Sequence, residues 1–380
     1  MIRKNNKSFF TVILSLCMVL AILFTGNIVT FAFSPMNVSN KIKPLTNYDG
    51  KEVTLINDDI LELMDMDYFD WTYIVTLYEE GQNNYKPKDV VLSWQAVSDA
   101  SYYNVKVSTD RNFTSVVDRY TVIGKTEVKV STPLTGTKYF WQVETEVNGE
   151  KIVSGIFSFK TADTPRTLNI DGVTNTRDLG GYTTSLGKMA QNKVIRGARL
   201  ENITEDGKVT MKRLGVKTDL DLRSTGEAGQ QNVSPIGVNY VNVDAPYYAT
   251  YSSKGINEEV NYPLVKEIMM VFADADNYPV YMHCSYGKDR TGTFAFLLGA
   301  LCGKTDVQLR QDYWLSVYSV DGAIPKTQIE NYYMQFELMS TYINGFVGRT
   351  FAEKTENYLK KVGLTNSDIA SIRANLLVQA

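Results

Sequence analysis

Two patterns of hydrophobic and polar residues divide this chain of 380 residues. Between Val90 and Lys160, apolar and polar residues alternate in short runs, which are separated by turns containing Gly, Asn, Asp and Pro. Alternation with a period of two is typical of strands with one buried face, and the turn residues favour strand connections. This part therefore predicts an all-β sandwich. The expected strands are VVLSWQAV, YYNVKVST, EVKVST, KYFWQVETEV and IFSFKT.

The pattern changes in the second half of the chain, where short apolar runs alternate with longer segments that have the apolar pattern of helices. Val216–Leu222 and Val280–Met282 are typical of buried strands. Thr291–Leu301 is apolar almost all round, as expected of a helix in a protein core. Alternating strands and helices predict an α/β domain with a central, mostly parallel sheet and helices on both faces. Thr305 opens a capping box for the next helix, and Gly363 suits a helix C-terminal cap.

The first residues predict an export signal. Three basic residues precede Phe9–Phe24, a run without charge, Pro or Gly, and Thr30 and Ala32 are small enough for a signal peptidase site. We therefore expect residues 1–32 to be a signal peptide and the protein to be secreted or held at the cell surface. The alternative is an uncleaved membrane anchor, although the run is shorter than the ~20 residues that a span needs.

The remaining domain limits follow from changes in composition. Residues 33–84 mix apolar and acidic positions without a sustained period, so they either supply the first strand of the sandwich or pack against the second domain. We expect the sandwich at residues 85–161 and the α/β domain at residues 167–380. Residues 162–166 form a short linker, because Pro165 discourages a helix across the boundary. The net charge of −3 and the lack of a long basic tract argue against a nucleic-acid partner.

One run of ten residues, HCSYGKDRTG (His283–Gly292), indicates the chemistry. It lies between an expected strand and an expected helix, which is where open α/β sheets bind anions. The five residues between Cys284 and Arg290 can curve around a tetrahedral anion. Cys284 would be the nucleophile, with its thiol ionised by the helix N-terminus and by Arg290. Arg290 suits a bidentate grip on phosphoryl oxygens, so the run predicts phosphoryl transfer through a cysteinyl-phosphate.

The other residues of the run have supporting roles. Gly287 allows a tight turn, and Thr291 is placed to hydrogen-bond the sulfur or the attacking water. His283, the only histidine of the chain, is expected to brace the loop rather than to bind a metal. No second histidine exists to protonate the leaving oxygen, so an aspartic acid is needed. Asp289 in the run is the first candidate, and Asp244 on a separate loop is the rival.

The run resembles the active-site loop HCxxGKDRTG of a bacterial tyrosine-phosphatase-like family. The resemblance extends upstream to NTRDLGGY (Asn175–Tyr182), VIRGARL and LGVKTDLDLRSTGE. Downstream it includes DYWLSVYS and YLKKVGLTNSDIASIR, so it covers about Thr167–Leu377. It implies a cysteine phosphatase without metal or cofactor, in which Cys284 is the nucleophile, Arg290 the phosphate ligand and Asp289 the acid.

The resemblance also suggests roles for further residues. Asp178 of the opening motif either lines the site or pairs structurally with its arginine neighbour, and we favour the structural role. Arg223 and Glu227 are expected to form local ion pairs. Tyr286 stands where the family commonly has a small residue, which leaves the choice of substrate open. The residues expected to bind the phosphate are Ser285, Tyr286, Gly287, Lys288 and Thr291.

The expected function is hydrolysis of phosphotyrosine, with phosphoserine and phosphothreonine as further substrates, or of phosphoinositides. The basic pair Lys288 and Arg290 resembles loops that accept inositol headgroups, which favours lipid substrates. A phosphatase that scavenges soluble inositol phosphates would use the same loop. In a different class of function, the sandwich would anchor the protein and the loop would only recognise phosphate.

The predicted sandwich resembles a fibronectin type III module. Trp94 lies on an early strand, and the spacing of Leu134 and Tyr139 is similar to the tyrosine corner of that fold. The resemblance implies a β-sandwich in front of the phosphatase domain. Such a module would bind a surface or a protein partner.

Overall fold

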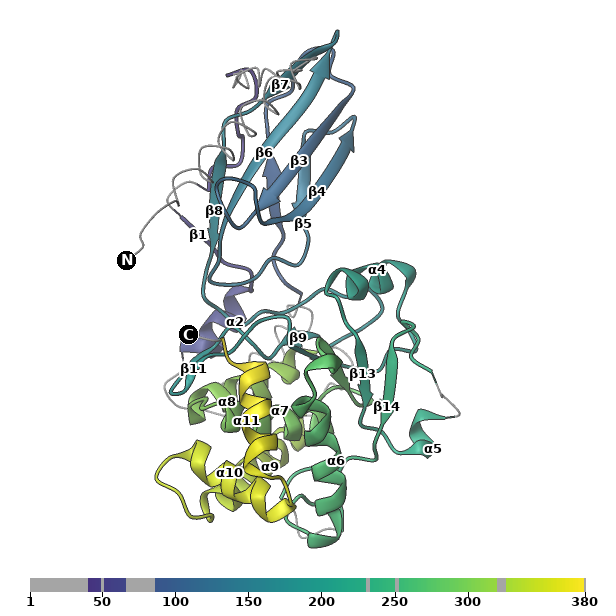
Figure 1. The fold of residues 1–380 in the computed structure, drawn as a ribbon, viewed down its shortest axis with the longest axis vertical. Coiled ribbons are helices and arrows are strands. Elements are labelled where there is room, and N and C mark those ends of the chain that lie inside the picture. Colours follow the sequence, from purple (N-terminus) through teal and green to yellow (C-terminus); the bar gives the residue numbers. More distant parts are fainter. Residues whose placement is uncertain are drawn as a thin grey trace, which may run out of the picture.

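The computed structural model describes residues 40–48, 51–65, 86–229, 233–249, 253–319 and 326–378. The predicted signal peptide lies outside these ranges. Figure 1 shows an elongated β-sandwich followed by an α/β domain at one of its ends. Among the helices in the described ranges, none has both the length and the hydropathy that a transmembrane segment needs.

The sandwich consists of two sheets around one hydrophobic core. The larger sheet has the order β1-β8-β6-β3-β4, with β7 paired to β6, and the smaller sheet is the pair β2-β5. Buried and less buried residues alternate along β6, where Trp141 and Val143 point inward. Trp94 lies in the same core, and the Leu134 amide donates to the Tyr139 hydroxyl at 2.7 Å, as a tyrosine corner requires. The strands are β1 (Glu52–Val53), β2 (Val90–Ser93), β3 (Tyr102–Ser108), β4 (Val116–Ile123), β5 (Glu127–Val130), β6 (Lys138–Val147), β7 (Glu150–Val153) and β8 (Phe157–Thr161).

The N-terminal segment contributes to both parts of the molecule. Ile42 and Leu55 are buried in the core of the sandwich, and β1 pairs in parallel with β8. The helix α2 (Asp58–Asp65) then reaches the second domain, where the Gln311 side chain donates to the Met64 carbonyl at 2.8 Å. From the sequence, this segment was expected either to supply the first strand of the sandwich or to pack against the second domain. The described part of the segment does both. The sandwich therefore begins earlier in the chain than its predicted limit.

The α/β domain contains a five-stranded sheet of order β14-β13-β15-β12-β9. Neighbouring strands pair in parallel except β9, which lies antiparallel to β12 at one edge. The strand β15 is therefore central, and it ends on the same side of the sheet as β12 and β13. The strands are β9 (Arg177–Asp178), β12 (Val194–Gly197), β13 (Thr218–Asp221), β14 (Asn239–Asn242) and β15 (Val280–His283), with a separate hairpin of β10 (Thr183–Thr184) and β11 (Gly187–Lys188).

Both faces of this sheet are covered. On one face, Val194 and Met282 lie in a large core to which helices α6 to α11 contribute. On the other face, Ile195 and Tyr281 pack with Met211 of α4. Successive strand residues point to opposite faces, so neighbours in sequence enter different cores. The helices are α4 (Glu205–Arg213), α5 (Thr225–Ala228), α6 (Tyr262–Ala273), α7 (Asp289–Leu301), α8 (Asp306–Trp314), α9 (Lys326–Asn344), α10 (Phe351–Val362) and α11 (Asn366–Leu376), with 3₁₀ turns η1 (Glu259–Asn261), η2 (Ala275–Asn277) and η3 (Leu315–Tyr318).

Two helix ends follow the sequence signals. The Thr305 side chain accepts from the Gln308 amide while the Gln308 side chain accepts from the Thr305 amide, so the predicted capping box begins α8. Gly363 ends α10 with a φ of +108°, a conformation that favours glycine. Both residues therefore mark where a helix begins or ends.

The two domains meet at a buried arginine. Arg166 is 1 % exposed, and its Nη1 lies 2.8 Å from Asp178 Oδ2 of the α/β domain. Its Nε donates to the Pro133 carbonyl of the sandwich at 2.9 Å. Gln191 and the Thr135 backbone exchange two hydrogen bonds across the same junction, at 2.9 and 3.0 Å. The predicted linker is thus fastened to both domains, because its last residue makes buried contacts that sequence patterns do not reveal.

Candidate active site

The predicted motif forms a loop, Cys284–Lys288, between β15 and α7. Just past the end of β13, the Leu222 amide donates to the His283 carbonyl at 2.8 Å and so continues the pairing of the strands up to the loop. The loop therefore lies at the carboxyl ends of the central parallel strands and at the N-terminus of a long helix. Backbone N–H groups and the helix dipole favour an anion at this position.

The carbonyl groups of the loop are tied to the surrounding protein. Three donors hold consecutive carbonyls: the Arg199 amide on Ser285 at 3.3 Å, the Asn175 side chain on Tyr286 at 2.9 Å, and the Arg196 side chain on Gly287 at 2.7 Å. A peptide unit is planar and trans, so a carbonyl that points outward turns the next N–H inward. The amides that follow these three carbonyls therefore point away from the three donors and remain available to bind an anion.

Gly287 is required by its backbone conformation and by its surroundings. Its φ is +68°, and a Cβ at this position would lie 2.3 Å from the carbonyl oxygen of Gly197. Gly197 ends the paired strand β12, so its carbonyl is not free to move away. The tight turn predicted from the sequence is therefore a close approach of two backbones that only glycine permits.

A buried carboxylate anchors the two arginines that brace the loop from behind. Asp312 of α8 contacts Arg196 Nη1 at 2.5 Å and Arg177 Nε at 2.9 Å. Burial alone would raise the pKa of Asp312, but the two guanidinium groups hold it well below its ordinary value. Arg177 also donates to the Asn175 side chain at 2.6 Å. The opening motif of the domain thus supports the loop through Asn175 and Arg177.

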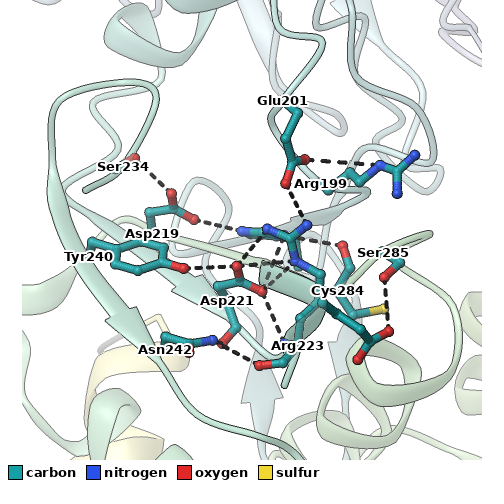
Figure 2. A network of polar contacts seen from close by, with 12 residues as sticks. Arg199, Glu201, Asp219, Asp221, Arg223, Ser234, Tyr240, Asn242, Cys284 and Ser285 are labelled. Atoms are coloured by element: carbon teal, nitrogen blue, oxygen red, sulfur yellow. Dashed lines mark hydrogen bonds and ion pairs between the residues drawn. The ribbon is translucent and has the colours of Figure 1, made fainter. Parts of the chain in front are cut away.

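The predicted nucleophile lies at the start of the loop. Cys284 is 3 % exposed and directly precedes Ser285, and both are labelled in Figure 2. Thr291 is fully buried in the first turn of α7, and its hydroxyl has no hydrogen-bond partner among the described residues. A buried hydroxyl without a partner is costly unless a ligand or water satisfies it. It can therefore donate to the sulfur or to an attacking water.

His283 faces two buried aspartates of β13. Its Nε2 lies 2.9 Å from Asp219 Oδ1, and its Nδ1 lies 3.1 Å from the Cys284 carbonyl and 3.9 Å from Asp221 Oδ1. Burial alone would lower the pKa of His283, but the two carboxylates outweigh it and raise the pKa to about 9. His283 is therefore a buried cation directly before Cys284, with contacts consistent with the predicted bracing role.

The prediction of local ion pairs for Arg223 and Glu227 holds only in part. Arg223 donates to both carboxylate oxygens of Asp221 and contacts Glu201, as Figure 2 shows. Glu227 instead reaches Arg290, with Nη1–Oε2 at 2.5 Å and Nη2–Oε1 at 2.9 Å. This contact lowers the pKa of Glu227 to about 2. Sequence reasoning missed this partner of Arg290, because the pair spans 63 positions.

The two candidate acids occupy different environments. Asp289 begins α7 directly after the loop, and its Oδ1 accepts from the Tyr248 hydroxyl at 2.5 Å. Asp244 is exposed on the segment that follows β14. That same segment carries Tyr248, whose phenol makes this contact with Asp289. The structure therefore places Asp289, of the two, next to the loop.

The remaining loop residues form its wall and its rim. Ser285 lies 3.5 Å from the Arg290 guanidinium. Lys288 is buried, and this burial lowers its pKa to about 8. Tyr286, where the family commonly has a small residue, is 45 % exposed. The aromatic side chain therefore lies at the rim of the loop and not in its floor.

Asp178 has a structural position, but the pair expected for it is different. It is buried, and its partners are Arg166, the Gly180 amide and the Asn192 amide, at 2.7 to 2.8 Å. The neighbouring Arg177 is committed to Asp312 instead. Within the described ranges, no group of three or more His, Cys, Asp or Glu side chains is arranged to hold a metal ion.

A thiol at the start of a loop with free backbone amides, followed by a fixed arginine and a helix N-terminus, is what a cysteine phosphatase uses to bind and attack a phosphate group. The fold and the loop place the chain in this class. Residues 168–378 match the model of the tyrosine phosphatase family, and the chain belongs to that family. It is a phosphatase.

Individual relatives are more distant. A tyrosine-protein phosphatase of Nostoc commune is 26% identical over 218 residues, which cover 48% of this chain and 73% of that protein. The core catalytic domain of the PP-IP phosphatase SIW14 from S. cerevisiae, in complex with citrate, matches 40% of this chain and 85% of its own, with 15% identity and a TM-score of 0.24. An Fn3-like protein from Clostridium thermocellum matches 20% of this chain and 79% of its own, with 28% identity and a TM-score of 0.17.

Proposed function

We propose that this phosphatase is an exported phosphomonoesterase that works through a cysteinyl-phosphate on Cys284. The observation that carries the proposal is the geometry of the loop. Its carbonyls are tied outward, so its amides can surround a phosphoryl group beside the thiol. Arg290 is already held in one plane by Glu227 before any substrate binds. Such preorganised donors are worth more in the transition state than flexible ones.

The reaction proceeds in two balanced steps. In the first, the Cys284 sulfur attacks phosphorus, the Sγ–P bond forms, and the bond to the leaving oxygen breaks as Asp289 donates a proton to that oxygen. In the second, water attacks phosphorus and gives a proton to Asp289, while the thiolate leaves and inorganic phosphate is released. Arg290 and the loop amides stabilise the charge on the phosphoryl oxygens in both steps. Thr291 donates to the sulfur as it becomes a leaving thiolate.

Phosphotyrosine in a protein is the substrate that we propose first. The exposed Tyr286 ring at the rim can stack on the ring of a bound phosphotyrosine. Phosphoinositides are the second candidate, and Lys288 favours them. Its pKa of about 8 leaves it mostly protonated at neutral pH, and a polyanionic headgroup would stabilise that charge further. Phosphoserine, phosphothreonine and soluble inositol phosphates would use the same chemistry.

Export rests on the sequence before residue 33, with its basic start and its uncharged run. The sandwich would then face a surface or protein partner outside the cell. Fractionation of expressing cells tests this part of the proposal. Protein shortened at its N-terminus and found in the medium or on the cell surface supports export. Retention inside the cell at full length contradicts it.

Turnover assays test the chemistry. Purified protein is assayed in EDTA with p-nitrophenyl phosphate, a phosphotyrosine peptide, phosphoinositide vesicles and phytate. We expect turnover to persist in EDTA and to fall by roughly a thousandfold or more in Cys284→Ser. Cys302→Ser is the control, because Cys302 is a buried thiol at the far end of α7. Activity retained in Cys284→Ser would contradict the mechanism, and the relative rates rank the substrates.

A further inference from the structure

The segment after β14 fastens onto the first turn of α7. The Tyr248 amide donates to Thr293 Oγ1 at 3.1 Å, and Thr293 Oγ1 donates to the Asp289 carbonyl at 2.9 Å. The Tyr248 hydroxyl donates to Asp289 Oδ1 at 2.5 Å. The backbone and the side chain of Tyr248 therefore both contact the first turn of α7. This turn begins with the residue to which we assign proton transfer.

Tyr248 is itself held firmly. Its φ is +57°, which a tyrosine rarely adopts, so the surrounding contacts must maintain it. The Tyr313 hydroxyl donates to the Tyr248 oxygen at 2.8 Å. Tyr313 is buried against Gly292, where a Cβ would lie 3.2 Å from its ring. Burial raises the pKa of Tyr313 well above its ordinary value, so this phenol remains a donor.

The two phenols fix the direction of the hydrogen-bond chain. A phenol has one proton to donate. Tyr313 gives its proton to the oxygen of Tyr248, and Tyr248 gives its own to Asp289. The chain thus ends on one particular oxygen of the carboxyl group, Oδ1. Because Tyr248 is the donor to Oδ1, the second carboxyl oxygen, Oδ2, is the one that can carry a proton.

We propose that Tyr248 is a positioning residue for Asp289, which selects the carboxyl oxygen that transfers the proton. The inference rests on the proposed function, because it requires Asp289 as the acid. With Oδ1 held by Tyr248, the proton is carried on Oδ2. It passes to the leaving oxygen as the Sγ–P bond forms, and the Tyr248 hydroxyl stabilises the charge left on the carboxylate. Oδ2 then accepts a proton from the water that attacks the cysteinyl-phosphate.

The position of Asp244 fits this assignment. Asp244 is exposed, whereas Tyr248, four residues later in the same segment, is buried against α7. The segment that carries Asp244 thus supplies a hydroxyl to Asp289 at the start of α7. Its part in the reaction is indirect, through the orientation of Asp289.

The test compares a good and a poor leaving group. Tyr248→Phe keeps the ring and removes only the hydroxyl. We expect kcat/KM for p-nitrophenyl phosphate to fall by about twofold, and kcat/KM for phenyl phosphate by about tenfold, because a general acid matters most when the leaving oxygen is basic. Tyr247→Phe is the matched control. The Tyr247 ring packs edge-on against Tyr248, and loss of the Tyr247 hydroxyl should leave kcat/KM unchanged for both substrates.

The inference is overturned if Tyr248→Phe slows both substrates equally or slows neither. Asp289→Asn, assayed on the same pair, separates this from failure of the proposed function. If Asp289→Asn selectively slows phenyl phosphate and Tyr248→Phe does not, only the inference is wrong. If Asp289→Asn shows no selectivity, the acid assignment itself is wrong. Adding Tyr248→Phe to Asp289→Asn should cause no further selective loss, because the phenol acts through the carboxyl group.

Discussion

Arg290 and Glu227 form a bidentate ion pair, with Nη1–Oε2 at 2.5 Å and Nη2–Oε1 at 2.9 Å. The contact joins the first turn of α7 to the short helix α5. A capping box between Ser224 and Glu227 holds the first turn of α5, so the carboxylate is itself positioned. The plane of the guanidinium is therefore set before a phosphate group arrives.

Removal of this carboxylate should weaken the grip on phosphate. In Glu227→Gln we expect kcat/KM to fall about tenfold and the inhibition constant of vanadate to rise by a similar factor, because Arg290 must then be ordered during binding. Steady-state kinetics measure both quantities. Glu205→Gln on α4 is the control, since Glu205 is exposed and pairs with Lys208. Equal kinetics in the two variants would show that the pair has no role in phosphate binding.

Gly287→Ala should damage both stability and activity. A Cβ at this position would lie 2.3 Å from the Gly197 carbonyl, in a backbone conformation that disfavours alanine. We expect a loss of about 2 kcal/mol or more in the free energy of unfolding and a severe loss of kcat/KM. Urea titration and turnover measure these effects. Gly155→Ala in the sandwich should leave both unchanged, because the nearest atom would lie 3.8 Å from the added Cβ.

The junction between the domains should depend on Arg166. Replacing it by Met leaves Asp178 buried without its cation, which should cost about 3 kcal/mol in the free energy of unfolding. Lys188→Met is the control. Lys188 contacts Asp163 of the linker at 3.5 Å, and both side chains are more than a third exposed, so its loss should cost less than about 1 kcal/mol. Equal losses in urea titrations would contradict the role assigned to Arg166.

The buried cation at His283 predicts how stability depends on pH. The folded pKa of about 9 exceeds the ~6.5 of an unfolded histidine. The stabilisation is therefore complete below pH 6.5 and is lost as the pH rises through 9. Between pH 6.5 and 7.5 this loss amounts to about 1 kcal/mol. Above pH 7.5, Lys288 and Lys304 make the folded state more stable as the pH rises, because burial lowers their pKa values to about 8.

Asp219→Asn tests this dependence. Without that carboxylate, burial of His283 is less well compensated, so the decline between pH 6.5 and 7.5 should be smaller than in the unchanged protein. Denaturant titrations at several pH values measure it. Asp206→Asn, an exposed position on α4, should retain the full decline. A decline in Asp219→Asn as large as in the unchanged protein would contradict the assignment of the cation to His283.

The parts of the fold and site that could be predicted from sequence are those encoded locally. The strand before Cys284, the apolar helix after it and the spacing to Arg290 are all contained within about twenty residues. The capping box at Thr305 and the bond from Leu134 to Tyr139 are local as well. Such features are determined by backbone geometry over a few turns, and for that reason a short window of sequence reveals them.

Contacts between distant segments could not be predicted in the same way. Glu227 was expected to pair locally but reaches Arg290, and Asp178 was expected beside Arg177 but binds Arg166. Tyr248 gave no signal at all, since a tyrosine in a loop has no characteristic spacing. These partners are chosen by the packing of the sheet and its connections, which determines which charges are buried together.

The central claim is that phosphate passes through a covalent bond to Cys284. Its most direct test is a rapid quench in denaturant at alkaline pH during turnover of an aryl phosphate, because the P–S bond is labile in acid, followed by mass analysis of the intact protein and its peptides. We predict one added phosphoryl group, carried on the peptide that contains Cys284, with more of it trapped in Asp289→Asn if water attack is slowed. Turnover without any phosphorylated form of that peptide, or equal labelling in Cys284→Ser, would contradict the account.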